Sequence, residues 1–312
     1  MASNLPGTKR AHDIGLNKRG NRSIGEGIIG VLLLLCALIS VVTTVAVVYS
    51  IADETIQFFR EVSVLEFFTS RVWTPLFANK NFGIAPLVVG TLMVTLIACV
   101  IGLPLGLAAA IYLAEFASDR ARRTITPILE VLAGIPTVVL GYFALLFVTP
   151  LLRRYIPGVD LFNPLSAGIV MGFMIMPTVT SISVDSLRAV PRSLREAGYG
   201  LGASKFELIT KVVVPAALSG IVASFILAIS RAIGETMIVT LAAGQRPNFT
   251  FDPRETIATM TSFIVQAGTG DQPTGSIGAR ALYAVAAVLF AITLLLNIAS
   301  QQVVERFSEK YE

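Results

Sequence analysis

Six long apolar stretches divide this sequence, and each is long enough to cross a lipid bilayer as a helix. They cover approximately residues 28–51, 84–116, 125–152, 165–186, 212–243 and 279–303. A bilayer core requires about 20 apolar residues in helical form. Apolar residues make up 54% of the chain and charged residues only 14%, whereas soluble domains average roughly 25% charged residues. The sequence therefore predicts an all-α polytopic membrane protein with about six transmembrane helices.

Lysine and arginine are unevenly distributed between the segments that connect these stretches. With the N-terminus placed in the cytoplasm, the cytoplasmic segments carry fifteen of these residues and the opposite side carries seven, while Arg231 and Arg280 lie in or at a helix. Cytoplasmic loops of membrane proteins are enriched in positive charge. We therefore expect both termini in the cytoplasm and external segments at about 52–83 and 245–278. The net charge of +4 reflects this topology rather than a surface that binds nucleic acid.

The first apolar stretch follows several basic residues, as the core of a secretory signal peptide does. Its length exceeds the roughly 7–15 apolar residues of such a core, and no clear small-residue cleavage site follows it. We interpret it as an uncleaved anchor helix. Residues 1–24 are expected to form a cytoplasmic tail, and residues 25–312 a single transmembrane domain.

Few residues of this chain are suited to catalysis or to metal binding. Cys36 and Cys99 both lie within apolar stretches, so no disulfide framework is indicated. His12, in the polar N-terminal tail, is the only histidine of the sequence, which argues against a histidine metal site or a Ser-His-Asp triad. The sequence predicts no enzymatic activity, no metal site and no cofactor in this chain.

Two charged residues, Arg231 and Glu235, interrupt the apolar stretch 212–243 close to its middle. Residues four apart share one face of a helix, and a charge at the bilayer centre costs about 2.5–3.5 kcal/mol on insertion scales. One interpretation is a local ion pair that only helps the helix to pack. The other is a station on a solute path, where Arg231 attracts an anion while Glu235 orients Arg231 and offsets its charge. A guanidinium presents planar donors that suit phosphate-like oxyanions.

Other polar side chains in the stretches carry weaker predictions. Thr236 and Thr240 could line the same path, or their hydroxyls could bond to carbonyls of their own helix. Glu115, Glu130 and Asp185 lie near the cytoplasmic ends of their stretches. We expect these carboxylates to form interfacial or subunit contacts rather than to bind a solute.

The cytoplasmic loop at about 188–215 carries a spaced pattern of residues. Glu196 and Ala197 are followed by Gly202 and, nine residues later, by a Val-x-Val-Pro sequence that ends at Pro215. A short amphipathic helix at 194–199 could dock into a groove on another protein.

This loop resembles the EAA loop of ABC-importer permeases, whose pattern is Glu-Ala-Ala, three residues, Gly, nine residues and Ile-x-Leu-Pro. Gly198 replaces the third alanine, and valines replace Ile and Leu. The resemblance implies that Glu196, Ala197, Gly202 and Pro215 belong to a coupling segment that fits a cleft on an ATPase subunit. The glycines of the loop lack the Gly-Lys-Ser/Thr ending of a phosphate-binding loop, so ATP and Mg²⁺ are expected in a separate ATPase chain.

Residues 230–236 resemble the fifth helix of the two permeases of the phosphate-specific ABC importer, and residues 237–240 continue as in the C-type permease. Residues 82–91, 109–115 and 134–142 are also similar to this group. The resemblance, which starts at about residue 65, implies a type I ABC-importer permease fold in the cell inner membrane. It implies half of a phosphate pathway, completed by an A-type permease, two ATPase subunits and an external phosphate-binding protein. A permease for molybdate or sulfate, and an ATP-independent secondary transporter or channel, remain as alternatives.

Overall fold

The computed structural model describes residues 19–77, 79–270, 272–273 and 275–307. Residues 1–18 of the predicted cytoplasmic tail lie outside the described residues. The chain divides into two units, Met1–Ser50 and Ile51–Glu312, and helix α1 (Arg19–Glu61) begins in the first and ends in the second. The described residues contain helices and no β-strand beyond an isolated bridge between Trp73 and Phe82. The predicted all-α class is confirmed.

Within the described residues, five helical segments are long and apolar enough to cross a membrane, and a sharply bent helix pair could supply a sixth. The five are Gly27–Glu61, Ala85–Phe116, Thr137–Tyr155, Pro164–Ala189 and Ile277–Gln302, and the bent pair is Lys205–Ala216 with Leu218–Ile233. These numbers agree with the prediction of about six spans. The first helix continues to Glu61, beyond the predicted end at residue 51.

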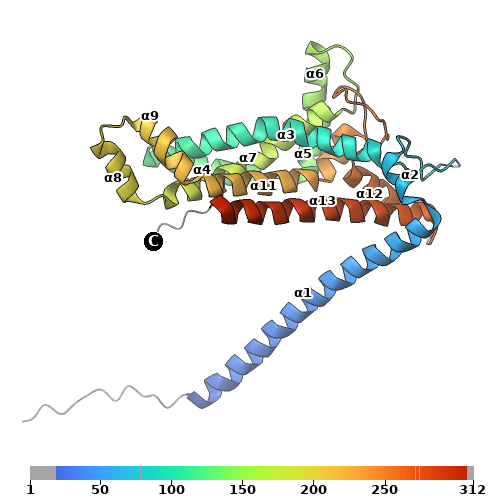
Figure 1. The fold of residues 1–312 in the computed structure, drawn as a ribbon, viewed down its shortest axis with the longest axis horizontal. Helices are drawn as coiled ribbons and strands as arrows, with labels where there is room; N and C mark the ends of the chain where they lie inside the picture. Colours follow the sequence, from blue (N-terminus) through green and yellow to red (C-terminus); the bar gives the residue numbers. More distant parts are fainter. Residues whose placement is uncertain (1–18, 78, 271, 274, 308–312) are drawn as a thin grey trace, which may run out of the picture. The chain divides into compact units, whose positions relative to one another are not determined.

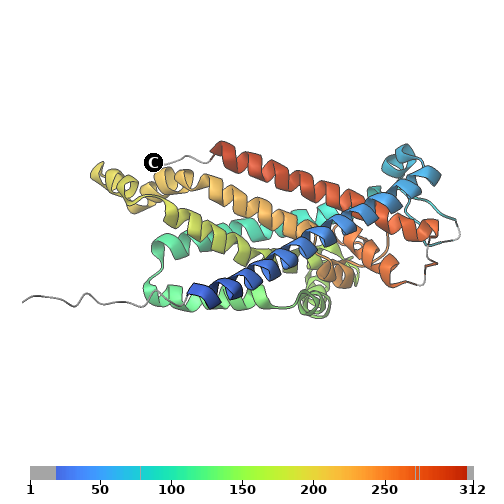
Figure 2. The same cartoon turned by 90° about the horizontal axis from the view of Figure 1, so that it is seen from below.

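Four helices of the second unit lie side by side as a bundle (Figures 1 and 2). They are α3 (Ala85–Ile111), α7 (Pro164–Ala189), α11 (Leu218–Ile233) and α13 (Ile277–Phe307). The short helices α2 (Val64–Thr69) and α12 (Met260–Thr269) lie at one end of this bundle, where Phe58, Phe67, Trp73, Phe82 and Phe263 form a buried aromatic cluster. Arg280 at the start of α13 forms ion pairs with Glu61 (2.6 Å) and Glu54 (3.6 Å) of α1 at this end.

Helices α3 and α7 approach each other through glycines spaced four residues apart. These glycines are Gly102 and Gly106 on α3, and Gly168 and Gly172 on α7. A Cβ atom added at Gly102 would lie 2.6 Å from the carbonyl oxygen of Gly172 and 2.6 Å from Cγ1 of Ile175. Small residues allow the backbones of membrane helices to pack this closely without any hydrophobic driving force between them.

Replacing Gly102 with alanine should therefore destabilise the α3–α7 contact. Overpacking of a tight contact costs about 1–3 kcal/mol, and the backbone carbonyl of Gly172 cannot move aside as a side chain could. Gly268→Ala is the matched control, because its Cβ would meet Leu282 at an ordinary 3.5 Å. Thermal unfolding in detergent measures the difference. Equal unfolding temperatures for the two variants would contradict the close packing.

The predicted third stretch, residues 125–152, is wrong as a single span. The chain instead forms α4 (Asp119–Gly134) and then a second rod made of α5 (Thr137–Phe143), the π-helical turn η2 (Ala144–Val148) and α6 (Thr149–Tyr155). Pro136 disfavours helical geometry at the residue before it, and Ile135 is extended with ψ 127°. Helix α4 packs along α7, whereas α6 projects away from the bundle (Figure 1).

The predicted fifth stretch, residues 212–243, is also interrupted. The stretch begins within a helical segment made of α9 (Lys205–Leu208), the π-helical turn η3 (Ile209–Val213) and α10 (Val214–Ala216). This segment and α11 meet at a bend of 68°. Helix α11 then ends at Ile233, and a separate π-helical turn η4 (Val239–Ala243) follows. Hydropathy stays high throughout this region, but the backbone changes direction at both breaks.

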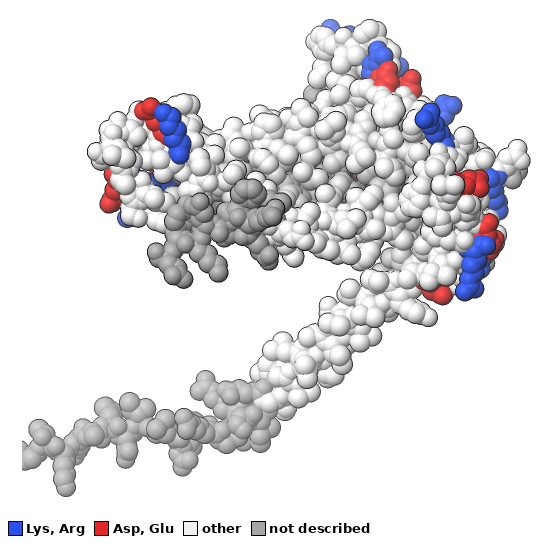
Figure 3. All heavy atoms as spheres, in the orientation of Figure 1, with Lys and Arg blue, Asp and Glu red and all other residues white. Residues whose placement is uncertain are grey.

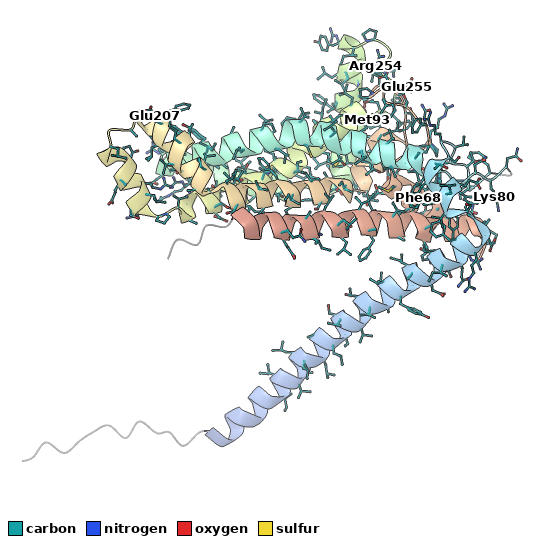
Figure 4. The ribbon with its side chains drawn as sticks, viewed as in Figure 1. Phe68, Lys80, Met93, Glu207, Arg254 and Glu255 are labelled. Carbon is teal, nitrogen blue, oxygen red and sulfur yellow. The ribbon has the colours of Figure 1, made fainter. Side chains whose placement is uncertain are left out.

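Charged side chains on the visible face of the second unit gather at the two ends of the bundle (Figure 3). The surface between these ends is almost free of them. Glu207 of α9 marks one end, and Lys80, Arg254 and Glu255 lie at the other (Figure 4). An uncharged band between two charged ends is the arrangement expected of helices that cross a bilayer.

Candidate functional site

Arg231 lies in the last turn of α11, and its side chain is exposed. Its Nη1 atom donates a hydrogen bond of 3.1 Å to the hydroxyl of Thr178 on α7. The prediction that Arg231 and Glu235 share one helix face is wrong, because the helix ends between them at Ile233. The ion pairs formed by the described residues do not include one between Arg231 and Glu235.

Glu235 lies at the break between α11 and η4, and only 9% of the residue is exposed. Its Oε1 atom accepts hydrogen bonds from the backbone N–H groups of Met237 (3.0 Å) and Ile238 (3.3 Å). Its backbone carbonyl accepts a bond of 2.7 Å from the hydroxyl of Thr261. Free N–H groups at the start of a helical turn need such partners. The carboxylate therefore caps the turn that follows it, and the predicted orienting contact with Arg231 is absent.

Thr236 and Thr240 follow the same break, and both hydroxyls bond to nearby backbone. The Thr236 hydroxyl donates to the carbonyl of Gly234 (3.2 Å), and the Thr240 hydroxyl donates to the carbonyl of Thr236 (2.6 Å). Of the two interpretations of these threonines, the bond to their own chain is the one found. Their hydroxyl oxygens keep lone pairs, but their protons are already engaged.

A cavity of about 420 Å³ opens between α4 and α7, and Thr178 is part of its wall. The wall is mixed in character. Its polar members are Thr126, Glu130, Thr178, Thr180, Ser181, Asp185 and Arg188, and its apolar members are Leu113, Leu129, Ala133, Pro177, Ile182 and Val184. Through its bond to Thr178, the Arg231 guanidinium is tied to a side chain of this wall. The cavity thus brings together two carboxylates predicted only as contact residues, Glu130 and Asp185.

Thr178 was not among the residues predicted to act with Arg231. It lies 53 positions earlier in the sequence, in the apolar stretch that became α7, and directly after Pro177. A hydroxyl within a buried helix is usually read as bonding to its own backbone. The contact depends on the packing of α11 against α7, which the sequence does not specify.

The predicted coupling segment forms helix α8 (Arg192–Gly200), as the pattern of the loop indicated. Glu196 and Ala197 are exposed on it, and beyond its end Leu201 is 90% exposed. Gly202 has a φ of +81°, a left-handed conformation that glycine adopts without steric cost. Gly198 is buried directly against the Leu208 side chain, where an added Cβ would collide with it. The glycine that departs from the family pattern thus permits close packing of α8 on α9.

The segment after α8 is held by a local network. The Ser204 hydroxyl and the Glu207 carboxylate form a reciprocal capping box at the start of α9. Pro215 lies in the first turn of α10, where its missing N–H leaves no bond unmade. The start of α9, on which α8 packs, is therefore fixed by local hydrogen bonds.

The sequence matches a known family over most of its length. A family model described as the binding-protein-dependent transport system inner membrane component matches residues 102–310. The probable ABC transporter permease protein YqgH of Bacillus subtilis is 33% identical over 282 residues, covering 90% of this chain and 91% of that protein. The phosphate transport system permease protein PstC of Mesorhizobium japonicum is 33% identical over 252 residues, with coverages of 74% and 75%.

Solved structures share the fold at lower identity. A permease chain of a bacterial alginate ABC transporter, in complex with an alginate-bound periplasmic protein, matches with a TM-score of 0.61 at 16% identity and covers 94% of this chain. The match covers 99% of that chain. The MetNI methionine ABC transporter in an inward-facing conformation matches with a TM-score of 0.56 at 19% identity, covering 70% of this chain and 94% of that chain. The protein is thus a multi-pass inner-membrane transporter subunit and not an enzyme. It belongs to the family of binding-protein-dependent transport system inner membrane components, the permease subunits of ABC transporters.

Proposed function

We propose that this chain is a C-type permease subunit of an ATP-driven importer for inorganic phosphate. One observation carries the proposal: an exposed guanidinium, that of Arg231, lies inside an apolar region and is tied to the wall of a cavity through Thr178. Within the described residues Arg231 forms no ion pair, and an arginine within an apolar span is costly unless it pairs or faces a water-filled cavity. A guanidinium recognises the oxygens of phosphate through charge-assisted hydrogen bonds. Relatives that carry the name phosphate transport system permease support the same substrate.

The chain would form half of the pathway, and an A-type permease would form the other half. Two ATPase subunits in the cytoplasm would supply ATP hydrolysis, with ATP and Mg²⁺ bound there, and an external phosphate-binding protein would deliver the anion. Both termini would lie in the cytoplasm, together with α8 and α9. In this orientation the exposed Glu196 and Ala197 face the ATPase subunits, and Gly202 and Pro215 shape the backbone that presents them.

Arg231 would attract the anion, and its contact with the Thr178 hydroxyl would hold the guanidinium beside the cavity. Glu235 offsets the positive charge of this region while it caps the turn η4, and so it supports the site without touching Arg231. Thr236 and Thr240 would lie along the path, but their hydroxyl protons are donated to backbone carbonyls, so they would not donate to the anion. A site of this kind must bind weakly enough to release its solute. The wall of the cavity carries two carboxylates, Glu130 and Asp185, beside the cation Arg188, and this balance of charge would keep the binding of an anion weak.

Competition between oxyanions tests the substrate. We expect uptake of radiolabelled phosphate by vesicles that contain the assembled importer and internal ATP to fall when unlabelled phosphate is added. Equal excesses of sulfate and molybdate should leave that uptake nearly unchanged, because specificity is a difference between affinities. Stronger competition by molybdate or sulfate would assign the permease to that anion instead. Uptake that persists without ATP would point to a secondary transporter or channel.

A further inference from the structure

A partly buried ion pair connects helix α8, the predicted coupling segment, to the helix bundle. Nη1 of Arg195 donates to both carboxylate oxygens of Glu115, at 2.8 Å each, and Nη2 donates to the backbone carbonyl of Leu187 at 2.8 Å. The Glu115 side chain is 9% exposed and the Arg195 side chain 22%. We call these three groups the Arg195 clasp. It joins α8 to the π-helical turn η1 (Tyr112–Phe116) that continues α3, and to the last turns of α7.

The Arg195 clasp is the direct polar link between α8 and the bundle. The backbone of α8 packs against α9 and η3, which belong to the same loop. Among the described residues, Arg195 makes the only hydrogen bonds that run from α8 to α3, η1 or α7. Glu196, the next residue, is exposed. Neighbouring residues on one helix therefore face in two directions, with Arg195 turned toward the bundle and Glu196 turned away from it.

The two helices held by the clasp are also the pair that meets through glycines. Because α3 and α7 contact each other backbone to backbone at Gly102 and Gly172, a displacement imposed on Glu115 and Leu187 acts on both together. Helix α7 also carries Thr178, the partner of Arg231. Thr178 lies nine residues before Leu187, or about 14 Å along a helix. A continuous chain of contacts thus runs from the exposed face of α8 to the guanidinium beside the cavity.

We infer that the Arg195 clasp transmits movements of α8 to α3 and α7, and so ties ATP hydrolysis to solute transfer. This inference rests on the proposed function, since α8 must be the segment that contacts the ATPase subunits. Arg195 and Glu115 act as positioning residues, which need not touch the solute. A partly buried charge pair suits this role, because separating it would leave the largely enclosed carboxylate of Glu115 without its partner.

The test compares hydrolysis with transport in the assembled importer, reconstituted in proteoliposomes with its ATPase subunits and binding protein. The variants are Arg195→Met, Arg195→Lys and the exchanged pair Glu115→Arg/Arg195→Glu. We expect the Arg195→Met importer to retain its ATPase subunits and to hydrolyse ATP. The number of ATP molecules hydrolysed per phosphate imported should rise about tenfold, since coupling free energies typically correspond to changes of about 5- to 150-fold. The ratio of ATP to phosphate in Arg195→Lys should fall between that of Arg195→Met and that of the wild type. A single ammonium group cannot bond to both Glu115 and Leu187 as the planar guanidinium does.

The exchanged pair restores the ion pair and should recover part of the coupling, which would tie the change in the ratio of ATP to phosphate to the pair rather than to either side chain alone. Lys211→Met is the matched control. It removes an exposed ion pair with Glu207 from the same loop and should leave the ratio of ATP to phosphate unchanged. The inference is overturned if uptake and hydrolysis fall in proportion in Arg195→Met, or if the ATPase subunits are lost. If the wild-type importer transports without ATP, the proposed function itself fails, whatever the Arg195 variants do.

Discussion

Phosphate uptake should fall by about 10- to 100-fold when Arg231 is replaced with glutamine. A hydrogen bond to a charged group contributes about 1.5–3 kcal/mol, and each 1.4 kcal/mol corresponds to about a factor of ten. Glutamine is neutral but can still donate to the Thr178 hydroxyl, so the substitution removes the charge and spares the contact between α11 and α7. The measurement is the initial rate of radiolabelled phosphate uptake, normalised to the amount of assembled complex.

Two further substitutions make this result specific. Arg231→Lys keeps the positive charge but loses the planar donor set, so it should transport at an intermediate rate. Arg254→Gln removes an exposed arginine that is already bonded to Asp252 in a segment predicted to be external, and it should transport at the wild-type rate. Wild-type uptake by a fully assembled Arg231→Gln importer would show that this guanidinium is not on the solute path.

Reversing the charge of Glu196 should detach or uncouple the ATPase subunits. Glu196 is exposed on α8, and we expect it to contact a surface of opposite charge on the ATPase subunit. Like charges placed against each other in an interface cost several kcal/mol, so Glu196→Lys should reduce both co-purification of the ATPase and uptake to near background. The fold should survive, since the side chain makes no hydrogen bond within the described residues.

Glu255→Lys is the matched charge reversal, because Glu255 lies at the opposite end of the bundle from α9 (Figure 4). It should leave ATPase co-purification intact. Undiminished ATPase binding and transport in Glu196→Lys would mean that α8 is not the coupling helix. Loss of binding in both variants would indicate a general defect in assembly rather than a local contact.

The membrane spans were predictable from sequence because apolar composition is a property of a continuous segment. Helix α8 was predictable for a similar reason, since its spaced pattern lies within one short loop. The interruptions were not predicted, because hydropathy is insensitive to backbone conformation. Pro136 is flanked by apolar residues on both sides. The hydropathy therefore stays high across the break that the proline ring imposes at Ile135. The end of α11 before Glu235 was hidden in the same way.

The side-chain contacts were the least predictable part of the site. The sequence indicates Arg231 as a charge within an apolar region, but spacing along the chain points to Glu235 as its partner. The observed partner, Thr178, is 53 positions away, and the partner of Arg195 is 80 positions away. Spacing rules describe neighbours on one helix. Contacts between helices depend on how the helices pack, which spacing along one helix does not specify.

The glycine contact between α3 and α7 also limits where this permease can flex. Interlocked backbones resist sliding, because a small shift would drive a carbonyl into the opposite chain. Any reshaping during a transport cycle would then fall to the breaks between helices, near Pro136, Ala217 and Gly234. Each break adjoins a different segment: the rod of α5, η2 and α6, the segment of α9, η3 and α10 that follows α8, and the turn that follows Arg231. The helix pair α3–α7 would then form a rigid centre, and the chain would bend around it at these three breaks.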